Sequence, residues 1–285
     1  LACKKGEYMQ TKKHIRDLFS LQGKVALVTG GVRGLGWQAS EALAEAGAAV
    51  IMTSRTKEHA ELAAERLERN TGQPCMGLAL EVSSEISWEK CMDEILSRFG
   101  HLDILVNNAG GRKVTSTPPA EDFAKGFLDD RPLEEWKYSL DVMLTGVFLG
   151  CRAVAPVMKR QKYGKIVNIA SIDGIRGRDL RIYKNTGLSA TVPDYLACKS
   201  AVINFTKGIA VVLAPFGVYV NCISPGGFER AQPELFIKHY AYETPLGRMG
   251  DDSKDLKGAV LFACAAASDY MVGHNLVIDG GFTAW

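Results

Sequence analysis

Residues 24–36, KVALVTGGVRGLG, decide the fold of this chain. The stretch begins with apolar residues typical of a buried strand, passes through a turn with four glycines, and leads into a helical pattern at 35–46. Glycine lets the backbone turn sharply and lets a phosphate approach without a Cβ in the way. The N-terminus of the following helix offers free N–H groups and a partial positive charge to a pyrophosphate. The stretch is therefore typical of a dinucleotide-binding unit.

The same alternation of strand and helix continues along the chain. Strands are expected at 24–29, 48–53, 75–80, 103–106, 165–169, 218–223 and 275–278, and helices at 35–46, 57–70, 87–99, 133–161, 194–214 and 253–267. Residues 226–250 suggest a loop region with short helices. Strands that are almost wholly apolar are buried on both faces, which favours a parallel sheet covered by helices.

The sequence therefore predicts an α/β fold, a single doubly wound Rossmann-like domain with a parallel sheet flanked by helices. We expect residues 1–20 to be an N-terminal extension and residues 21–285 to form the dinucleotide-binding catalytic domain. No internal repeat, low-complexity tract or linker indicates a second domain.

The composition indicates which kinds of binding partner to expect. With 34 basic and 32 acidic residues the formal net charge is +2, which gives no reason to expect nucleic acid or an anionic membrane. No uninterrupted apolar run approaches the roughly 20 residues that span a bilayer. Residues 1–19 are mixed and basic without an apolar centre, unlike a secretory signal. A cytoplasmic protein with a small-molecule substrate is expected.

The seven cysteines are scattered and contain no CxxC pair. Several lie in apolar runs, such as Cys222 in Val-Asn-Cys-Ile. This pattern favours small buried thiols over a disulfide framework or a zinc site, and no metal is expected.

The end of the second strand bears on the choice of cofactor. An acidic residue there would bind the adenosine ribose hydroxyls and favour NAD, but the sequence has Ser54 and Arg55. A guanidinium can pair with the 2′-phosphate of NADP, and Arg33 in the glycine turn could reach the same phosphate. The hypothesis is a preference for NADP(H), with NAD(H) also usable. The alternative is that both arginines are ordinary solvated surface residues.

At this point the chain resembles the short-chain dehydrogenase/reductase family over nearly its whole length. The resemblance rests on five landmarks in order: TGGVRGLG at 29–36, NNAG at 107–110, Ser171 in NIAS, Tyr195 and Lys199 in YLACK, and Pro225-Gly226-Gly227 after a strand. A lone YxxxK is common by chance, whereas five ordered motifs at compatible spacings are not.

The resemblance implies hydride transfer between a nicotinamide and a carbonyl or alcohol carbon, with Ser171, Tyr195 and Lys199 as catalytic residues. Tyr195 and Lys199 are four apart on a predicted helix and share a face. A neighbouring ammonium favours the phenolate and lowers a tyrosine pKa that is ordinarily near 10. The cofactor-binding residues that follow are Gly30, Val32, Arg33, Gly34, Leu35, Gly36, Ser54, Arg55, Glu81, Val82, Asn108, Ala109, Gly110, Tyr195, Lys199, Pro225 and Gly226.

The sequence departs from the family in three places. Met143 occupies the position of the family's usual asparagine and cannot hold a proton-relay water through an amide. Glu81-Val82 stands where an aspartate usually contacts adenine. The stretch between Ser171 and Tyr195 is longer than usual, and its residues 176–191 carry four basic side chains. This insertion and the ending 279–285 resemble gluconate 5-dehydrogenase-like members, and basic residues would suit an anionic substrate. A solvated surface loop is the alternative.

Three functions remain open from the sequence. The first is an NADP(H)-dependent reductase or dehydrogenase acting on a keto/hydroxyl pair of a sugar acid or polyol. The second is a 3-oxoacyl thioester reductase, which shares the motifs but usually lacks the insertion. The third is a cofactor-binding protein without catalysis, a regulator or scaffold, which Met143 keeps open. The resemblance also implies a homo-oligomer, commonly a tetramer.

Overall fold

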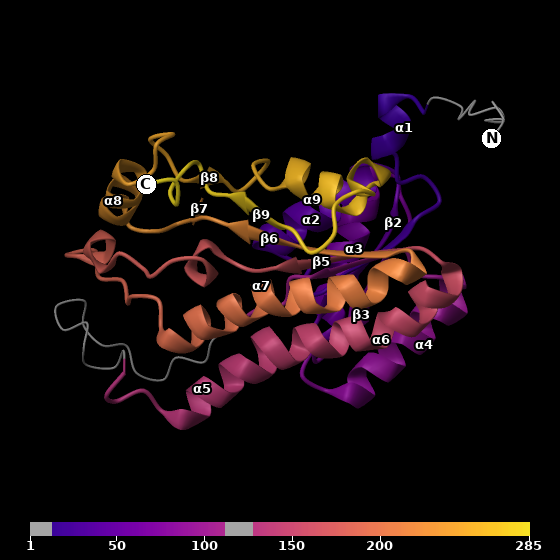
Figure 1. Ribbon diagram of the computed structural model, residues 1–285, viewed down its shortest axis with the longest axis horizontal. Helices are drawn as coiled ribbons and strands as arrows, with labels where there is room; N and C mark the ends of the chain where they lie inside the picture. Colours follow the sequence, from indigo (N-terminus) through magenta and orange to yellow (C-terminus); the bar gives the residue numbers. More distant parts are fainter. Residues whose placement is uncertain (1–12, 112–127) are drawn as a thin grey trace, which may run out of the picture.

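The computed structural model describes residues 13–111 and 128–285, whose centre is one parallel sheet (Figure 1). Its seven strands run in the order β3-β2-β1-β4-β5-β6-β9, and every neighbouring pair is parallel. Their bounds are β1 (Val25–Val28), β2 (Ala49–Ser54), β3 (Cys75–Ala79), β4 (Ile104–Asn107), β5 (Gly164–Ile169), β6 (Val218–Pro225) and β9 (Asn275–Ile278). The order reverses between β1 and β4, the switch point where ligands bind in open α/β sheets.

Helices cover both faces of the sheet, as the apolar strands require (Figure 1). One face carries α2 (Gly34–Glu45), α3 (Lys57–Thr71) and α9 (Lys257–Cys264), and the other carries α4 (Glu85–Phe99), α6 (Gly146–Gln161) and α7 (Pro193–Leu213). The remaining α-helices are α1 (Ile15–Phe19), α5 (Leu133–Leu140) and α8 (Glu234–Tyr242). The predicted doubly wound α/β fold is confirmed.

Two segments differ from the sequence-based expectation. The helix expected over 133–161 is interrupted by a π-helical turn, Asp141–Thr145, between α5 and α6. The region 226–250 contains α8 and, at its ends, β7 (Phe228–Glu229) and β8 (Gly250–Asp251), which pair in parallel. Neither feature has a periodic apolar signal, since a π-turn shifts the register by one residue and a two-residue strand is too short to alternate.

Residues of the 176–191 insertion pack against the C-terminal end of the chain. A small apolar cluster joins the insertion and the segment before it to α8 and the chain end; its buried members are Ile172, Ile182, Tyr183, Phe236, Tyr240, Met249 and Phe282. Tyr240 and Phe282 stack with their ring centroids 4.5 Å apart. The insertion is therefore anchored rather than a freely solvated loop.

By length and composition, two helical stretches could cross a membrane, Leu133–Gln161 and Pro193–Phe216. Both pack on the sheet, however, and contribute Val154 and Val202 to its core. Core helices of this kind pass the same test of length and hydropathy.

Of the six cysteines in the described part of the chain, all are unpaired; five are buried and Cys75 is half-buried. Cys3 lies outside the described residues. Burial raises the pKa of the Cys91, Cys151, Cys222 and Cys264 thiols to about 12. The expected small buried thiols are confirmed for five of these six cysteines.

Candidate active site

At its glycine positions, the turn between β1 and α2 is packed too closely for a side chain. Gly30 and Gly34 have φ of +61° and +54°, in the left-handed region that favours glycine. A Cβ on Gly36 would lie 2.2 Å from the carbonyl oxygen of Gly30 and 2.5 Å from Nδ2 of Asn108. Val32 and Leu35, between these glycines, are half-buried against the core.

The end of β4 is tied to this turn by hydrogen bonds. Nδ2 of Asn108 donates to the carbonyl oxygens of Thr29 (2.9 Å) and Gly30 (3.1 Å). Oγ1 of Thr29 accepts from the backbone N–H groups of Asn108 and Ala109. Gly110, one residue on, is exposed. Asn108 therefore holds the turn in place, and Thr29 is a supporting residue that the sequence analysis did not single out.

This arrangement fits a dinucleotide. The turn presents backbone without Cβ atoms at the first residues of α2, where helix N–H groups point outward and the dipole favours a phosphate. It lies at the switch point of the sheet. The residues present thus match the chemistry of a pyrophosphate.

The predicted adenosine-side residues lie at the start of α2, at the end of β2 and after β3. Arg33 is the N-cap residue of α2, and both Arg33 and Arg55 have exposed side chains. Nη1 of Arg55 is 3.5 Å from the Tyr138 hydroxyl. Ser54 Oγ accepts from the backbone N–H of Thr56. Exposed guanidinium groups at this end remain available to an added phosphate.

Glu81 and Val82 join β3 to α4. Oε1 of Glu81 accepts from the Ser83 hydroxyl at 2.9 Å, and the carbonyl oxygen of Val82 accepts from the indole of Trp88 at 2.9 Å. Val82 also fills the space where a Cβ on Gly146 would stand. The pair is thus fixed between sheet and helix.

Lys199 on α7 is buried, and its ammonium donates a 2.7 Å hydrogen bond to the carbonyl oxygen of Ile169 at the end of β5. Burial lowers the pKa of Lys199 to about 8. Its Nζ lies 5.7 Å from the centroid of the Tyr195 ring. The predicted Tyr-Lys pair therefore shares one helix face at the carboxyl edge of the sheet.

Ser171 is brought to α7 by the short 3₁₀ turn that follows it, Ile172–Gly174. Its hydroxyl accepts from the backbone N–H of Asp173 at 3.1 Å. Gly174 lies against the backbone of Lys199, and its carbonyl oxygen accepts from the Ser200 hydroxyl at 3.0 Å. The structure thus brings together the elements that carry Ser171, Tyr195 and Lys199.

Buried amides lie behind these residues. Nδ2 of Asn107 donates to Asn168, and Nδ2 of Asn168 donates to the hydroxyl of Thr206 on α7, both at 2.9 Å. This chain links β4, β5 and α7 through the core. Sequence reasoning reached Asn107 through its motif but had no local signal for Asn168 or Thr206.

A buried ion cluster holds the start of α7 and was not foreseen. Arg131 donates to both carboxylate oxygens of Asp194, Nε to Oδ1 at 2.9 Å and Nη2 to Oδ2 at 3.0 Å. Arg131 also pairs with Glu135, four residues later in the first turn of α5. Because Asp194 directly precedes Tyr195 and is fully buried, the cluster fixes the helix turn that carries the phenol.

The arginines of the insertion are mostly engaged. Arg178 pairs with Asp173 at 3.0 Å and donates to the Tyr183 hydroxyl at 3.0 Å. Arg176 donates to the carbonyl oxygen of Phe282, and Arg181 forms an exposed pair with Asp179. Two salt bridges therefore neutralise part of the basic character that the sequence suggested for an anionic substrate.

Met143 is buried within the π-helical turn, where its side chain offers no amide to a water. Ser139, four residues earlier on α5, is also buried, and its hydroxyl has no hydrogen-bond partner among the described residues. An unpaired buried hydroxyl is rare and costly. It lies one turn before the position where the family places its asparagine.

Of the last predicted residues, Pro225 ends β6 and Gly226 directly follows it. Gly226 donates its N–H to the carbonyl oxygen of Ile278, and a Cβ there would lie 2.9 Å from the Cα of Asp279. Gly227 donates its N–H to the Tyr240 hydroxyl, which the sequence analysis missed. The PGG segment is therefore held between β9 and α8.

Comparison with known proteins adds three findings. A family model described as enoyl-(acyl carrier protein) reductase matches residues 30–283. The 5-keto-D-gluconate 5-reductase of Escherichia coli is 34% identical over 273 residues, 94% of this chain and 98% of that protein. The 3-oxoacyl-(acyl-carrier-protein) reductase of Aquifex aeolicus is 36% identical over 265 residues, 92% of this chain and 98% of that protein.

Among solved structures, a gluconate 5-dehydrogenase from Burkholderia cenocepacia in complex with NADP and tartrate has a TM-score of 0.83. It is 34% identical and covers 95% of this chain and 100% of that chain. A short-chain type dehydrogenase/reductase from Mycobacterium marinum has a TM-score of 0.82 at 33% identity, covering 96% and 100%.

Proposed function

This chain belongs to the short-chain dehydrogenase/reductase family, and from that premise we propose that it interconverts a keto and a hydroxyl group of a sugar acid or polyol with NADP(H). It is an oxidoreductase like its relatives, so the cofactor-binding scaffold without catalysis is set aside. Support for the substrate class comes from the relative named 5-keto-D-gluconate 5-reductase and from the neighbour solved with NADP and tartrate.

The cofactor would be held by the glycine turn, with its diphosphate at the start of α2 and its adenosine end toward Arg33 and Arg55. When bound, the nicotinamide supplies the hydride to the carbonyl carbon or accepts it from the alcohol. Asn108 keeps the turn open for the dinucleotide by fixing the carbonyl groups of Thr29 and Gly30.

In the direction of reduction, the Tyr195 hydroxyl gives a proton to the substrate oxygen as negative charge develops there. The Lys199 ammonium, buried beside this ring, favours the phenolate that results. Ser171 donates a hydrogen bond to the same substrate oxygen and orients it. In oxidation the proton moves the other way.

The observation that carries this proposal is the contact of the Ser171 turn with α7, beside the Lys199–Tyr195 pair at the carboxyl edge of the sheet. α7 carries the general acid, Tyr195, and the cation that stabilises its phenolate, Lys199, and the turn after β5 carries the hydrogen-bond donor, Ser171. These two elements meet at the carboxyl edge of the sheet, the edge on which the glycine turn also lies.

The experiment is to follow NADPH absorbance with 5-keto-gluconate, keto-sugars, simple ketones and 3-oxoacyl thioesters. We expect turnover with a keto-sugar acid or keto-polyol, and no turnover after Tyr195→Phe although NADPH still binds. Turnover only with the thioesters would favour the second candidate, which the Aquifex relative supports. Full activity of Tyr195→Phe would remove the phenol from the mechanism.

We also propose a cytoplasmic homotetramer. Unpaired thiols in the described part of the chain suit a reducing compartment. The outer faces of α6, α7 and the turn after α7 expose Phe148, Val211, Val212 and Phe216, an apolar surface that subunit contact would cover. Light scattering after size exclusion tests this; a monomeric mass at micromolar concentration would contradict it.

A further inference from the structure

A guanidinium group lies directly on the glycine turn. Arg230, which follows β7, places its Cζ 3.2 Å and its Nη2 3.3 Å from where a Cβ on Gly34 would stand. Gly34 is the first residue of α2. The absence of a side chain there lets the cation approach the helix N-terminus, although the dipole at that end repels a cation. Such a placement needs anionic partners to hold it.

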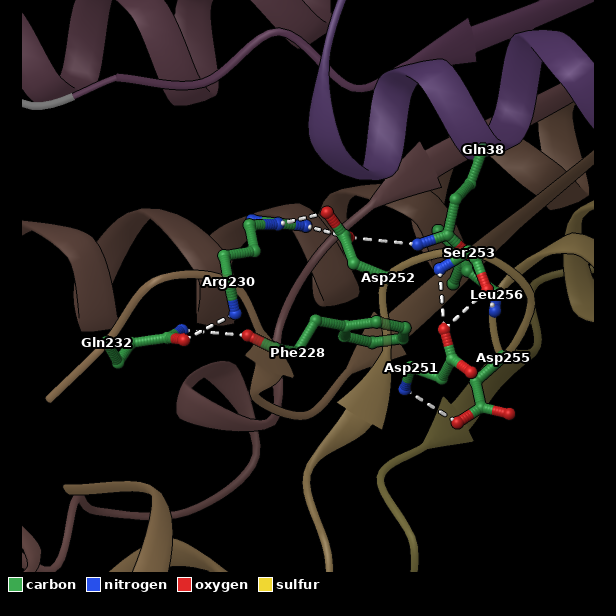
Figure 2. A network of polar contacts seen from close by, with 9 residues as sticks. All are labelled: Gln38, Phe228, Arg230, Gln232, Asp251, Asp252, Ser253, Asp255 and Leu256. Carbon is green, nitrogen blue, oxygen red and sulfur yellow. Dashed lines mark hydrogen bonds and ion pairs between the residues drawn. The ribbon is translucent and has the colours of Figure 1, made fainter. Parts of the chain in front are cut away.

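Asp252, on the segment after β8, supplies a negative charge to this guanidinium (Figure 2). Its carboxylate accepts from Nε and from Nη2 of Arg230, both at 2.7 Å, in a bidentate pair. The carboxylate is itself held by Gln38 of α2, whose Nε2 donates to Asp252 Oδ1 at 3.0 Å. Gln38 is fully buried, and its Oε1 accepts from the backbone N–H of Leu256.

The backbone of Arg230 is braced as well. Gln232 turns back so that its Oε1 accepts from the N–H of Arg230 and its Nε2 donates to the carbonyl oxygen of Phe228 (Figure 2). Gln232 therefore fixes the backbone of Arg230, and Asp252 fixes its guanidinium group. Orientation is set before any ligand binds.

One edge of the guanidinium remains for a ligand. The fork to Asp252 uses Nε and Nη2, and Nη1 has no hydrogen-bond partner within residues 13–111 and 128–285. The Arg230 side chain is 45% exposed. Its N–H groups thus border the same turn whose backbone suits a pyrophosphate.

We propose that Arg230 binds the diphosphate of the dinucleotide, with Asp252 and Gln38 as positioning residues. The inference rests on the proposed function, because it presupposes a dinucleotide on this turn. The diphosphate is common to NADPH and NADH, so Arg230 contributes to the affinity for both. The exposed Arg33 and Arg55, by contrast, would act on the 2′-phosphate alone.

The test is calorimetric binding of four ligands, NADPH, NADH, ADP-ribose and 2′-AMP, to the wild type and to Arg230→Gln. ADP-ribose carries the diphosphate without the nicotinamide, and 2′-AMP carries the 2′-phosphate without the diphosphate. Loss of one charge-assisted hydrogen bond should weaken NADPH, NADH and ADP-ribose by about tenfold or more and leave 2′-AMP unchanged.

Matched variants separate this role from general damage. Arg248→Gln breaks a neighbouring exposed pair, Arg248–Asp255, and should leave all four affinities unchanged. Asp252→Asn should weaken the three diphosphate ligands less than Arg230→Gln does, and the double variant should bind them no more weakly than Arg230→Gln alone. Additive losses in the double variant would contradict the positioning role of Asp252.

Three outcomes overturn the proposal in different ways. If the wild type binds the dinucleotides and a folded Arg230→Gln binds them equally well, Arg230 does not contact the diphosphate and the proposed function stands. If the wild type binds none of NADPH, NADH and ADP-ribose, the role of Arg230 and the proposed function are both wrong. A shared loss for 2′-AMP would show distortion of the whole turn rather than a lost contact.

Discussion

Gly174 touches the backbone of Lys199 so closely that no methyl group fits between them. A Cβ at Gly174 would lie 2.6 Å from the carbonyl carbon and 2.7 Å from the carbonyl oxygen of Lys199. These are backbone atoms, which cannot rotate away. We expect Gly174→Ala to push the Ser171 turn off α7, lowering kcat at least tenfold and stability by about 1–3 kcal/mol. Steady-state kinetics and urea unfolding measure the two effects.

Gly177 in the same loop is the matched control for this change. A Cβ there meets nothing within 4 Å, so Gly177→Ala should leave kcat and the free energy of unfolding unchanged. Equal effects of the two substitutions would show that the contact between Gly174 and Lys199 is unimportant.

The Lys199 ammonium predicts an alkaline limit to reduction. Because burial lowers the pKa of Lys199 to about 8, the group is charged below that pH and loses its proton above it. kcat/KM for NADPH, which reports the free enzyme, should therefore fall as pH rises through about 8. In Lys199→Arg the guanidinium stays charged over this range. The alkaline decrease of kcat/KM should therefore move to higher pH, while the maximal rate drops. If the alkaline decrease of kcat/KM occurs at the same pH in Lys199→Arg, a group other than Lys199 causes it.

The buried cluster at the start of α7 predicts a large loss of stability. Asp194→Asn removes the bidentate carboxylate from the buried Arg131, which keeps Glu135 as its anionic partner. Breaking these buried, charge-assisted hydrogen bonds should cost about 1–3 kcal/mol. Turnover should fall too, because Asp194 precedes Tyr195. Lys238→Met, which breaks the exposed pair with Glu234, is the control and should change stability by less than about 1 kcal/mol. Comparable denaturation midpoints for the two variants would refute the cluster's role.

The unpaired hydroxyl of Ser139 predicts a stabilising substitution. Ser139→Ala removes a buried polar group that lacks a partner in the described part of the chain. We expect a gain of about 1 kcal/mol, seen as a rise in Tm of about 2 °C. Should Ser139→Ala instead lower both Tm and kcat, the hydroxyl holds a water beside Met143, in place of the family's asparagine.

The sequence predicted the parts of the molecule that depend on short stretches. The strand–turn–helix at Gly30–Gly36 and the spacing of Tyr195 and Lys199 are local patterns, and the fold that contains them is confirmed. The bounds of β9 were also predicted without error, because its flanking residues are turn formers.

Contacts between distant residues left no such pattern. Gln38 and Asp252 are 214 positions apart, and nothing beside either residue indicates the other. Arg178 illustrates the same limit. Its sequence context suggested an anionic ligand, whereas its guanidinium pairs with Asp173 and donates a hydrogen bond to the Tyr183 hydroxyl. Pairing of this kind depends on how the insertion folds back, which periodicity does not encode.

The burial of the cysteines also determines how their thiols react with oxidants and alkylating reagents. With pKa values of about 11 to 12, the thiols of Cys91, Cys151, Cys198, Cys222 and Cys264 hold a negligible fraction of thiolate at neutral pH, and thiolate is the form that peroxides and alkylating reagents attack. Cys151 is further enclosed by Asn107 and Asn168. We therefore expect peroxides and alkylating reagents to leave these five buried thiols unmodified.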